Sequence, residues 1–155
     1  MRACQKIDGL QFEGGFAPRA KNDIPGFEQL TLGKRVETAE YIVKTKKSLA
    51  AFNTPAVAQC HGWKLGEFLA MGMAIISTPI SRVLPEELQD QRNILLTDGS
   101  EDDIRQKISQ LMNVESLGNV LRAESRAYYE RNLSPEAVVR SILERLNIDA
   151  GRPVR

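Results

Sequence analysis

Short apolar runs alternate with amphipathic segments along the chain from Val36 onward. The runs Ser48–Phe52, Ala74–Thr78 and Asn93–Thr97 each end at a turn signal, such as a proline or an Asp-Gly pair, which is typical of buried strands. Leu10–Phe12 is a weaker candidate for a fourth strand. Because strands that are apolar on both faces belong to parallel sheets covered by helices, the pattern predicts an α/β fold.

Helical periodicity fills the segments between these runs. Apolar residues recur at helical spacing from Val36, and lysines near residue 47 suit the negative end of the helix dipole. A second helix is expected from Trp63 to Met71, with Gly72 as the residue that ends it. Leu84–Leu88 predicts one or two further helical turns.

Three more helices are expected after Gly99, and their starts are marked by Ser100, Ser116 and the Ser134-Pro135 pair. We expect the last helix to bury the residues of one apolar face, which are Val138, Val139, Ile142, Leu143 and Leu146. The predicted fold class is α/β, with an open parallel sheet of three to four strands flanked by helices.

The two ends of the chain differ from this regular part. Residues 1–35 are rich in glycine and proline, which predicts an irregular N-terminal segment. Residues 36–148 form the predicted α/β domain, and residues 149–155 form a loose tail. The long loop predicted between residues 16 and 34 suggests that the chain is part of something larger.

Composition narrows the classes of function. In this chain of 155 residues, 21 basic and 20 acidic side chains leave a net charge of +1, which argues against binding to nucleic acid or anionic membranes. No apolar run is long enough to span a bilayer, and the N-terminus does not read as a signal peptide. Two cysteines and one histidine exclude a disulfide framework and a polyhistidine metal site. We expect no metal and a cytoplasmic protein, with the inner face of the membrane as an alternative location.

The candidate chemistry lies where the first strand leads into the Trp63 helix. Gly62 allows a close backbone approach, so the amides of Trp63, Lys64 and Leu65 are candidates to bind an anion. The cation of Lys64 opposes the helix dipole, and a bound phosphate would explain its position. Glu67 lies on nearly the same face and could accept hydrogen bonds from two vicinal hydroxyls; the alternative is a surface ion pair with Lys64.

Three neighbouring residues leave alternatives open. His61 is either a general base or phosphate donor, or a hydrogen-bonding residue without chemistry. Trp63 could stack on a base, although packing under the loop is the more common arrangement. Cys60 suggests the thiolate nucleophile of a small hydrolase, but it adjoins His61 in sequence, and adjacent side chains rarely face each other.

The stretch Gln59–Ile76 resembles the signature E-P-F-G-x-x-x-x-E-A-x-A-x-G-x-P-V-I of retaining nucleotide-sugar glycosyltransferases with the GT-B fold. Gly62, Glu67, Ala70 and Gly72 fall in register with it. The resemblance covers roughly residues 47–146. It implies that residues 36–148 are a Rossmann-like donor-binding domain, that Glu67 binds the donor ribose, and that the amides after Gly62 meet the diphosphate.

The departures from this signature define the rest of the hypothesis. Gln59 stands where the family has a glutamate facing the donor sugar, and Cys60-His61 stands where it has Pro-Phe, which leaves Gln59 and His61 as weak catalytic candidates. The resemblance implies a truncated, donor-binding half of a glycosyltransferase, with a nucleotide sugar as substrate and no separate cofactor. Its acceptor-binding domain would be missing or supplied by a partner chain. The alternative is a non-enzymatic α/β interaction or nucleotide-binding module.

Overall fold

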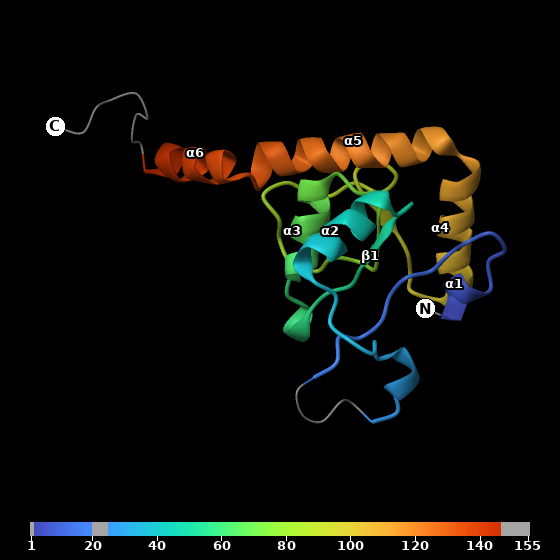
Figure 1. Cartoon of the computed structure of the whole chain (residues 1–155). Helices are drawn as coiled ribbons and strands as arrows, with labels where there is room; N and C mark the ends of the chain where they lie inside the picture. Colours follow the sequence, from blue (N-terminus) through green and yellow to red (C-terminus); the bar gives the residue numbers. More distant parts are fainter. Residues whose placement is uncertain (1, 20–24, 147–155) are drawn as a thin grey trace.

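The computed structural model describes residues 2–19 and 25–146, and it has an α/β fold with an open, three-stranded parallel sheet flanked by helices (Figure 1). The sheet order is β1-β2-β3. The strands are β1 (Ala51–Asn53), β2 (Ile75–Ser77) and β3 (Leu95–Leu96). The helices are α1 (Arg2–Gln5), α2 (Thr38–Lys47), α3 (Trp63–Met71), α4 (Glu101–Asn113), α5 (Glu115–Asn132) and α6 (Pro135–Arg145), and the 3₁₀ turns are η1 (Glu28–Leu30) and η2 (Val57–Gln59). The predicted fold class and three of the predicted strands are therefore confirmed.

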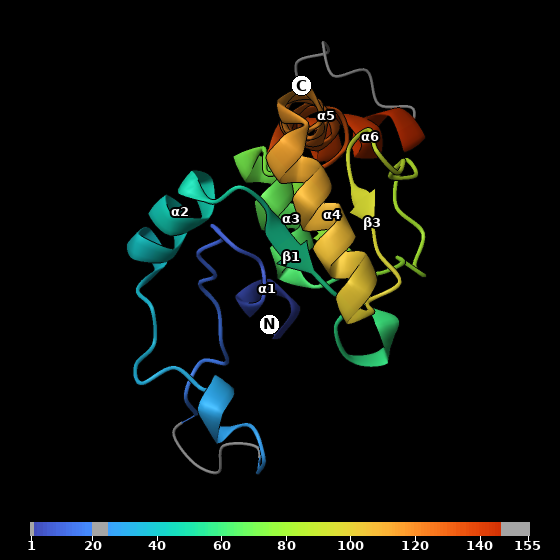
Figure 2. The same cartoon turned by 90° about the vertical axis from the view of Figure 1, so that its right-hand side faces the viewer.

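The two faces of the sheet are covered by two apolar clusters. On one face Ile75 and Ile94 pack with Leu69 of α3 and Tyr128 of α5. On the other face Ile76 and Leu95 pack with side chains of α4 and the start of α5, together with Cys4 of α1, and Figure 2 shows α4 in front of the sheet. Adjacent strand residues thus alternate between the clusters, as a sheet buried on both sides requires.

Helix α5 closes the end of the sheet where the strands begin. Ser125 donates a hydrogen bond to the carbonyl of Asn93 over 2.9 Å, and Arg122 donates to the carbonyls of Ser48 and Leu49. All three acceptors come just before a strand. The amino edge of the sheet is therefore sealed, while the carboxyl edge lies at the opposite end of the body (Figure 1).

Local signals placed most helix ends correctly. Gly72 adopts the left-handed conformation, with a φ of 63°, and ends α3 as predicted. The hydroxyls of Ser100 and Ser134 accept hydrogen bonds from the amides of Asp103 and Ala137, so both serines cap their helices. The predicted cap at Ser116 is wrong, because Val114 is both the C-cap of α4 and the N-cap of α5, and α5 starts at Glu115.

Two predicted elements are absent from the described chain. Leu10–Phe12 forms no strand; Leu10 and Phe12 instead pack their side chains against the cluster beneath α4.

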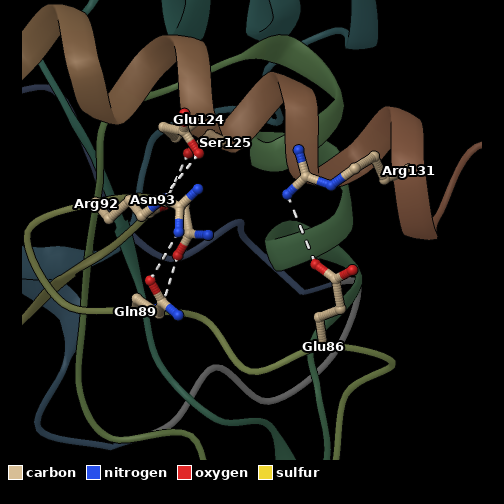
Figure 3. A network of polar contacts seen from close by, with 7 residues as sticks. All are labelled: Glu86, Gln89, Arg92, Asn93, Glu124, Ser125 and Arg131. Atoms are coloured by element: carbon tan, nitrogen blue, oxygen red, sulfur yellow. Dashed lines mark hydrogen bonds and ion pairs between the residues drawn. The ribbon is translucent and has the colours of Figure 1, made fainter.

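Leu84–Leu88 forms no helix, because its backbone is held by α5: the Tyr128 hydroxyl donates to the Glu86 carbonyl over 2.6 Å. Figure 3 shows how Arg131 reaches Glu86 and how Arg92 joins Gln89 to Glu124 of the same helix. Side-chain bonds from α5 thus replace the hydrogen bonds of a local helix.

The predicted buried face of α6 is wrong. Val138, Val139 and Ile142 are exposed, and the buried residue of this helix is Ala137. At 100° per residue, Ala137 lies on the side opposite the apolar stripe, so α6 contacts the body through its small-residue side. Figure 1 shows α6 continuing past the end of the body, where no sheet face lies beneath it.

Among the described residues before α2, the helical elements are α1 and η1, and the rest is loop with one isolated β-bridge. Phe16 exchanges backbone hydrogen bonds of 2.8 Å with Leu30 and Leu32, and its ring meets Phe27 edge to face at 5.5 Å. The loop around η1 extends away from the helices and sheet (Figure 2). The predicted tail, residues 149–155, lies outside the described residues, and within the described residues no helix is long and apolar enough to cross a membrane.

Tyr128→Phe tests the attachment of the Leu84–Leu88 segment to α5. Tyr128 is fully buried, and the substitution removes its hydroxyl, which leaves the Glu86 carbonyl without its hydrogen-bond donor. We expect the free energy of unfolding to fall by about 1–2 kcal/mol. Urea denaturation measures the change. Tyr129→Phe is the matched control, because the Tyr129 hydroxyl forms no hydrogen bond with the described residues, and an equal loss in both variants would contradict the assignment.

Ile142→Gln tests the orientation of α6. Because Ile142 is exposed, we expect the free energy of unfolding to change by less than about 0.5 kcal/mol. Leu121→Ala, at a fully buried position of α5, is expected to cost about 2–5 kcal/mol in the same assay. If Ile142→Gln instead lowered the free energy of unfolding by as much as Leu121→Ala, Ile142 would be buried, as the sequence pattern predicts.

Candidate functional site

A small depression opens at the carboxyl edge of the sheet, where the loops after β1 and β2 meet. The depression is shallow, and the space of about 210 Å³ over it includes open solvent. It is lined by Asn53, Thr54, Pro55, Gln59, Cys60, His61, Gly62, Leu65, Ile80 and Ser81. Ligand sites in parallel α/β sheets lie at this edge.

Three contacts join the two loops. Arg82 donates a hydrogen bond to the Ala58 carbonyl over 2.9 Å, the Ser81 hydroxyl lies 3.5 Å from the Gln59 carbonyl, and Nε2 of His61 lies 3.4 Å from the Val83 carbonyl. They draw residues 58–61 against residues 81–83, although β1 and β2 are separated in sequence by the whole of α3. The loops thus form one surface with the depression between them.

The N-terminus of α3 borders this depression. Gly62 is its N-cap residue, lines the depression, and provides no side chain to cap the helix. The amides of Trp63 and Lys64 have no hydrogen-bond partner among the described residues, so they remain available to an anion. The expectation for Leu65 is corrected: its amide donates to the Gly62 carbonyl over 3.1 Å, and its side chain is buried in the core.

Lys64 and Glu67 lie on the exposed side of α3 and outside the lining of the depression. No ion pair joins them within the part of the chain described, so the alternative of a surface pair is not realised. Glu67 instead accepts a hydrogen bond of 3.3 Å from the Tyr41 hydroxyl of α2. Burial of Tyr41, the negative charge of Glu67 and this hydrogen bond raise the pKa of Tyr41 above its ordinary value.

Three highly exposed apolar side chains lie within two residues in sequence of the residues that line the depression. Trp63 is 91% exposed, so the expectation that it packs under the loop is wrong. Val57 and Val83 are 90% and 96% exposed and come from the two loops that the Arg82 and His61 contacts join. Exposed apolar side chains mark a contact surface where they form one contiguous patch.

The remaining candidates do not form a catalytic pair. Cys60 is exposed and its thiol is 3.9 Å from the Ala58 carbonyl, while the ring of His61 meets Val83, so the two side chains share no hydrogen bond. Ala58 and Gln59 adopt left-handed φ values of 55° and 61°. Such conformations cost a non-glycine residue about 1 kcal/mol or more and are common in functional loops. Gln59 therefore reaches the depression through a strained turn.

Sequence reasoning missed three residues of this region. Tyr41 and Arg82 act through contacts with Glu67 and Ala58, which lie 26 and 24 residues away in the chain. Asn53 ends β1 and is buried beneath the depression, 4% exposed. Its only sequence signal is a polar residue at the end of an apolar run, where the carboxyl edge of a parallel sheet is expected.

Among the described residues, no three or more His, Cys, Asp or Glu side chains are grouped so that they could hold a metal ion. Comparisons of the chain with protein-family models, with curated proteins and with solved structures found no match. The function is therefore argued from the geometry of this edge of the sheet.

Glu67→Gln tests the contact between α2 and α3. Removing the negative charge stabilises the tyrosinate of Tyr41, so we expect the pKa of Tyr41 to fall towards its ordinary value, while burial keeps part of the shift. Spectroscopic titration of the tyrosines measures it. Glu87→Gln changes an exposed glutamate away from Tyr41 and is expected to leave the titration unchanged; a Tyr41 pKa that ignores Glu67→Gln would show that the two side chains do not meet.

Proposed function

We propose that this chain is the donor-binding half of a glycosyltransferase that transfers a sugar from a nucleotide-diphosphate sugar to an acceptor. One observation carries the proposal: the N-terminus of α3 lies beside a depression at the carboxyl edge of a parallel sheet, and two of its amides have no partner among the described residues and no side-chain cap. Backbone donors and the positive end of the helix dipole favour an anion at this position. A diphosphate is the anion that the resemblance of residues 59–76 implies.

The charges near α3 support the same assignment. Lys64 is exposed in the first turn without an ion pair to the described residues, and Arg82 brings a second cation to the neighbouring loop. Glu67 lies one turn further along α3, where its carboxylate could accept hydrogen bonds from the two hydroxyls of a ribose. Because Tyr41 holds Glu67 through a single bond of 3.3 Å, ribose hydroxyls could replace that contact without breaking the core.

Stabilisation of the departing diphosphate would be the protein's contribution to catalysis, since fixed donors at the α3 N-terminus favour the negative charge that develops there. The donor half alone carries no acceptor site, so we expect nucleotide binding without turnover. A partner chain or a further domain would complete the cleft.

Binding of UDP or GDP tests the proposal. We expect either nucleotide to shift the NMR signals of the amides from Gly62 to Glu67, and Glu67→Ala to weaken binding by roughly tenfold or more. Gly62→Ala is a second variant. A Cβ at position 62 meets nothing closer than 3.9 Å and its φ is −75°, so the fold accepts it while a bound diphosphate would be pushed away.

Tyr41→Phe is the matched control for Glu67→Ala, because it frees the Glu67 carboxylate without removing it; nucleotide affinity should be kept or increased. If millimolar nucleotide leaves these amides unchanged in the folded protein, the proposal fails.

A non-enzymatic interaction module is the second candidate function, favoured by the exposed side chains of Val57, Trp63 and Val83. These residues would then form a protein contact, and the α3 N-terminus would face the partner. A Trp63→Ser variant that keeps full nucleotide affinity but loses association with another chain would support this alternative.

A further inference from the structure

The hydrogen bonds of β1 show which of its backbone groups face away from the sheet. The amide of Ala51 donates to the Ala74 carbonyl over 2.9 Å. The carbonyl of Asn53 accepts from the Thr78 amide over 3.4 Å. Ala51 and Asn53 are therefore the residues of β1 that bond to β2. Because the bonds of a parallel ladder use alternate residues of each strand, the N–H and C=O of Phe52 point to the outer side of β1, away from β2.

This outer side of β1 has no strand beside it. Neither backbone group of Phe52 has a hydrogen-bond partner among the described residues, and the Phe52 side chain is 44% exposed. The backbone groups of Ala50 and Thr54, two residues to either side, also have no partner within the described chain. The outer side of β1 thus presents both donors and acceptors.

The outer side of β3, at the other end of the sheet, is covered instead. The amide of Leu96 donates to Oδ1 of Asp90 over 2.7 Å, and the Ile94 carbonyl accepts from the Gln91 amide over 2.8 Å. Proteins commonly block the outer strands of a sheet with charged side chains or covering loops, because an unblocked strand is a template for a further one. The described chain blocks β3 in this way and does not block β1.

Exposed apolar side chains come from the segment that leads into β1. Between residues 36 and 52, five large apolar side chains are 38–51% exposed, which are those of Val36, Ile42, Val43, Leu49 and Phe52. Figure 2 shows α2, which carries two of them, at the β1 end of the sheet and away from β3. Apolar side chains beside an unpaired strand favour a contact with another polypeptide.

We infer that the outer side of β1 binds a second copy of this chain, with the two β1 strands antiparallel about a two-fold axis at Phe52. Phe52 presents one donor and one acceptor, so each N–H meets the C=O of Phe52 in the other copy. Ala50 of each copy then lies opposite Thr54 of the other. The two three-stranded sheets become one continuous sheet.

Self-complementarity is the reason for choosing a second copy as the occupant. An antiparallel pair about a two-fold axis satisfies the outward groups of β1 with the same groups of its copy, and it brings the two Phe52 rings together as a cross-strand aromatic pair. The net charge of +1 leaves little long-range repulsion between two copies. The inference goes beyond the proposed function and does not depend on it, because this contact uses neither the N-terminus of α3 nor a nucleotide.

Sedimentation of the full chain from micromolar to millimolar concentration tests the association. We expect a monomer–dimer equilibrium. Hydrogen exchange of the Phe52 amide, followed by NMR over the same concentrations, tests the site of contact, because the amide becomes hydrogen-bonded in the dimer. We expect its exchange to slow as the dimer forms. A chain that stays monomeric at millimolar concentration, or a dimer in which the Phe52 amide exchanges as in the monomer, would overturn the inference.

Phe52→Lys places two cations opposite each other at the axis, and we expect it to raise the dimer Kd by roughly tenfold or more. Val139→Lys is the matched control, because Val139 is 55% exposed on α6, and we expect its dimer Kd to stay unchanged. Phe52→Pro is a second variant that removes the outward N–H, which proline does without harm on an outer strand, and we expect it to weaken the dimer as well. A dimer that survives Phe52→Lys and is lost in Val139→Lys would place the contact on α6 and overturn the inference.

Discussion

The burial of β2 on both faces is the constraint on which the rest of the structure depends. Ile75 and Ile76 point to opposite sides, and both are withdrawn from water, so helices must cover each face of the sheet. The hydrogen-bond ladder also fixes β2 between β1 and β3. Helix α3 and the later part of α5 cover one side, and α4, α1 and the start of α5 cover the other.

The two ends of the sheet are treated differently. At the amino end, Arg122, Ser125 and Tyr128 of α5 satisfy backbone carbonyls of the segments that lead into the strands or between them. At the carboxyl end, the side chains of Ser81 and Arg82 donate hydrogen bonds to the carbonyls of Gln59 and Ala58, and helix α3 begins there without a side-chain cap. One end of the strands is thus closed by α5, while at the other end the amides of Trp63 and Lys64 and Oδ1 of Asn53 have no partner in the described part of the chain. This asymmetry is what a binding site on a rigid scaffold requires.

Several large apolar side chains on α2 and α6 are exposed to solvent. The stripe of α6 with Val138 and Ile142 faces away from the body, and Ile42 and Val43 of α2 are exposed as well. Both helices are amphipathic by sequence, but each contacts the body through other residues: Ala137 in α6, and Tyr41 and Thr45 in α2. The orientation of such a helix is set by its connecting loops and by its few strong contacts. Where no sheet face lies beneath the helix, its apolar stripe does not determine which side faces the body.

The sequence by itself determined the features that depend on neighbours along the chain. The apolar runs predicted three strands and the parallel, two-sided sheet, and Gly72, Ser100 and Ser134 marked helix ends because caps act within one turn. Gly62 and Lys64 could also be identified as candidates for an anion site, because their positions at the start of a helix follow from the local sequence. Only the tertiary structure decided that Leu84–Leu88 is held as a loop by Tyr128, that Glu67 meets Tyr41, and that Asn53 bonds to Ser77 of the next strand. Each of these joins segments far apart in sequence, and such contacts are set by how the elements pack, which no local pattern of residues records.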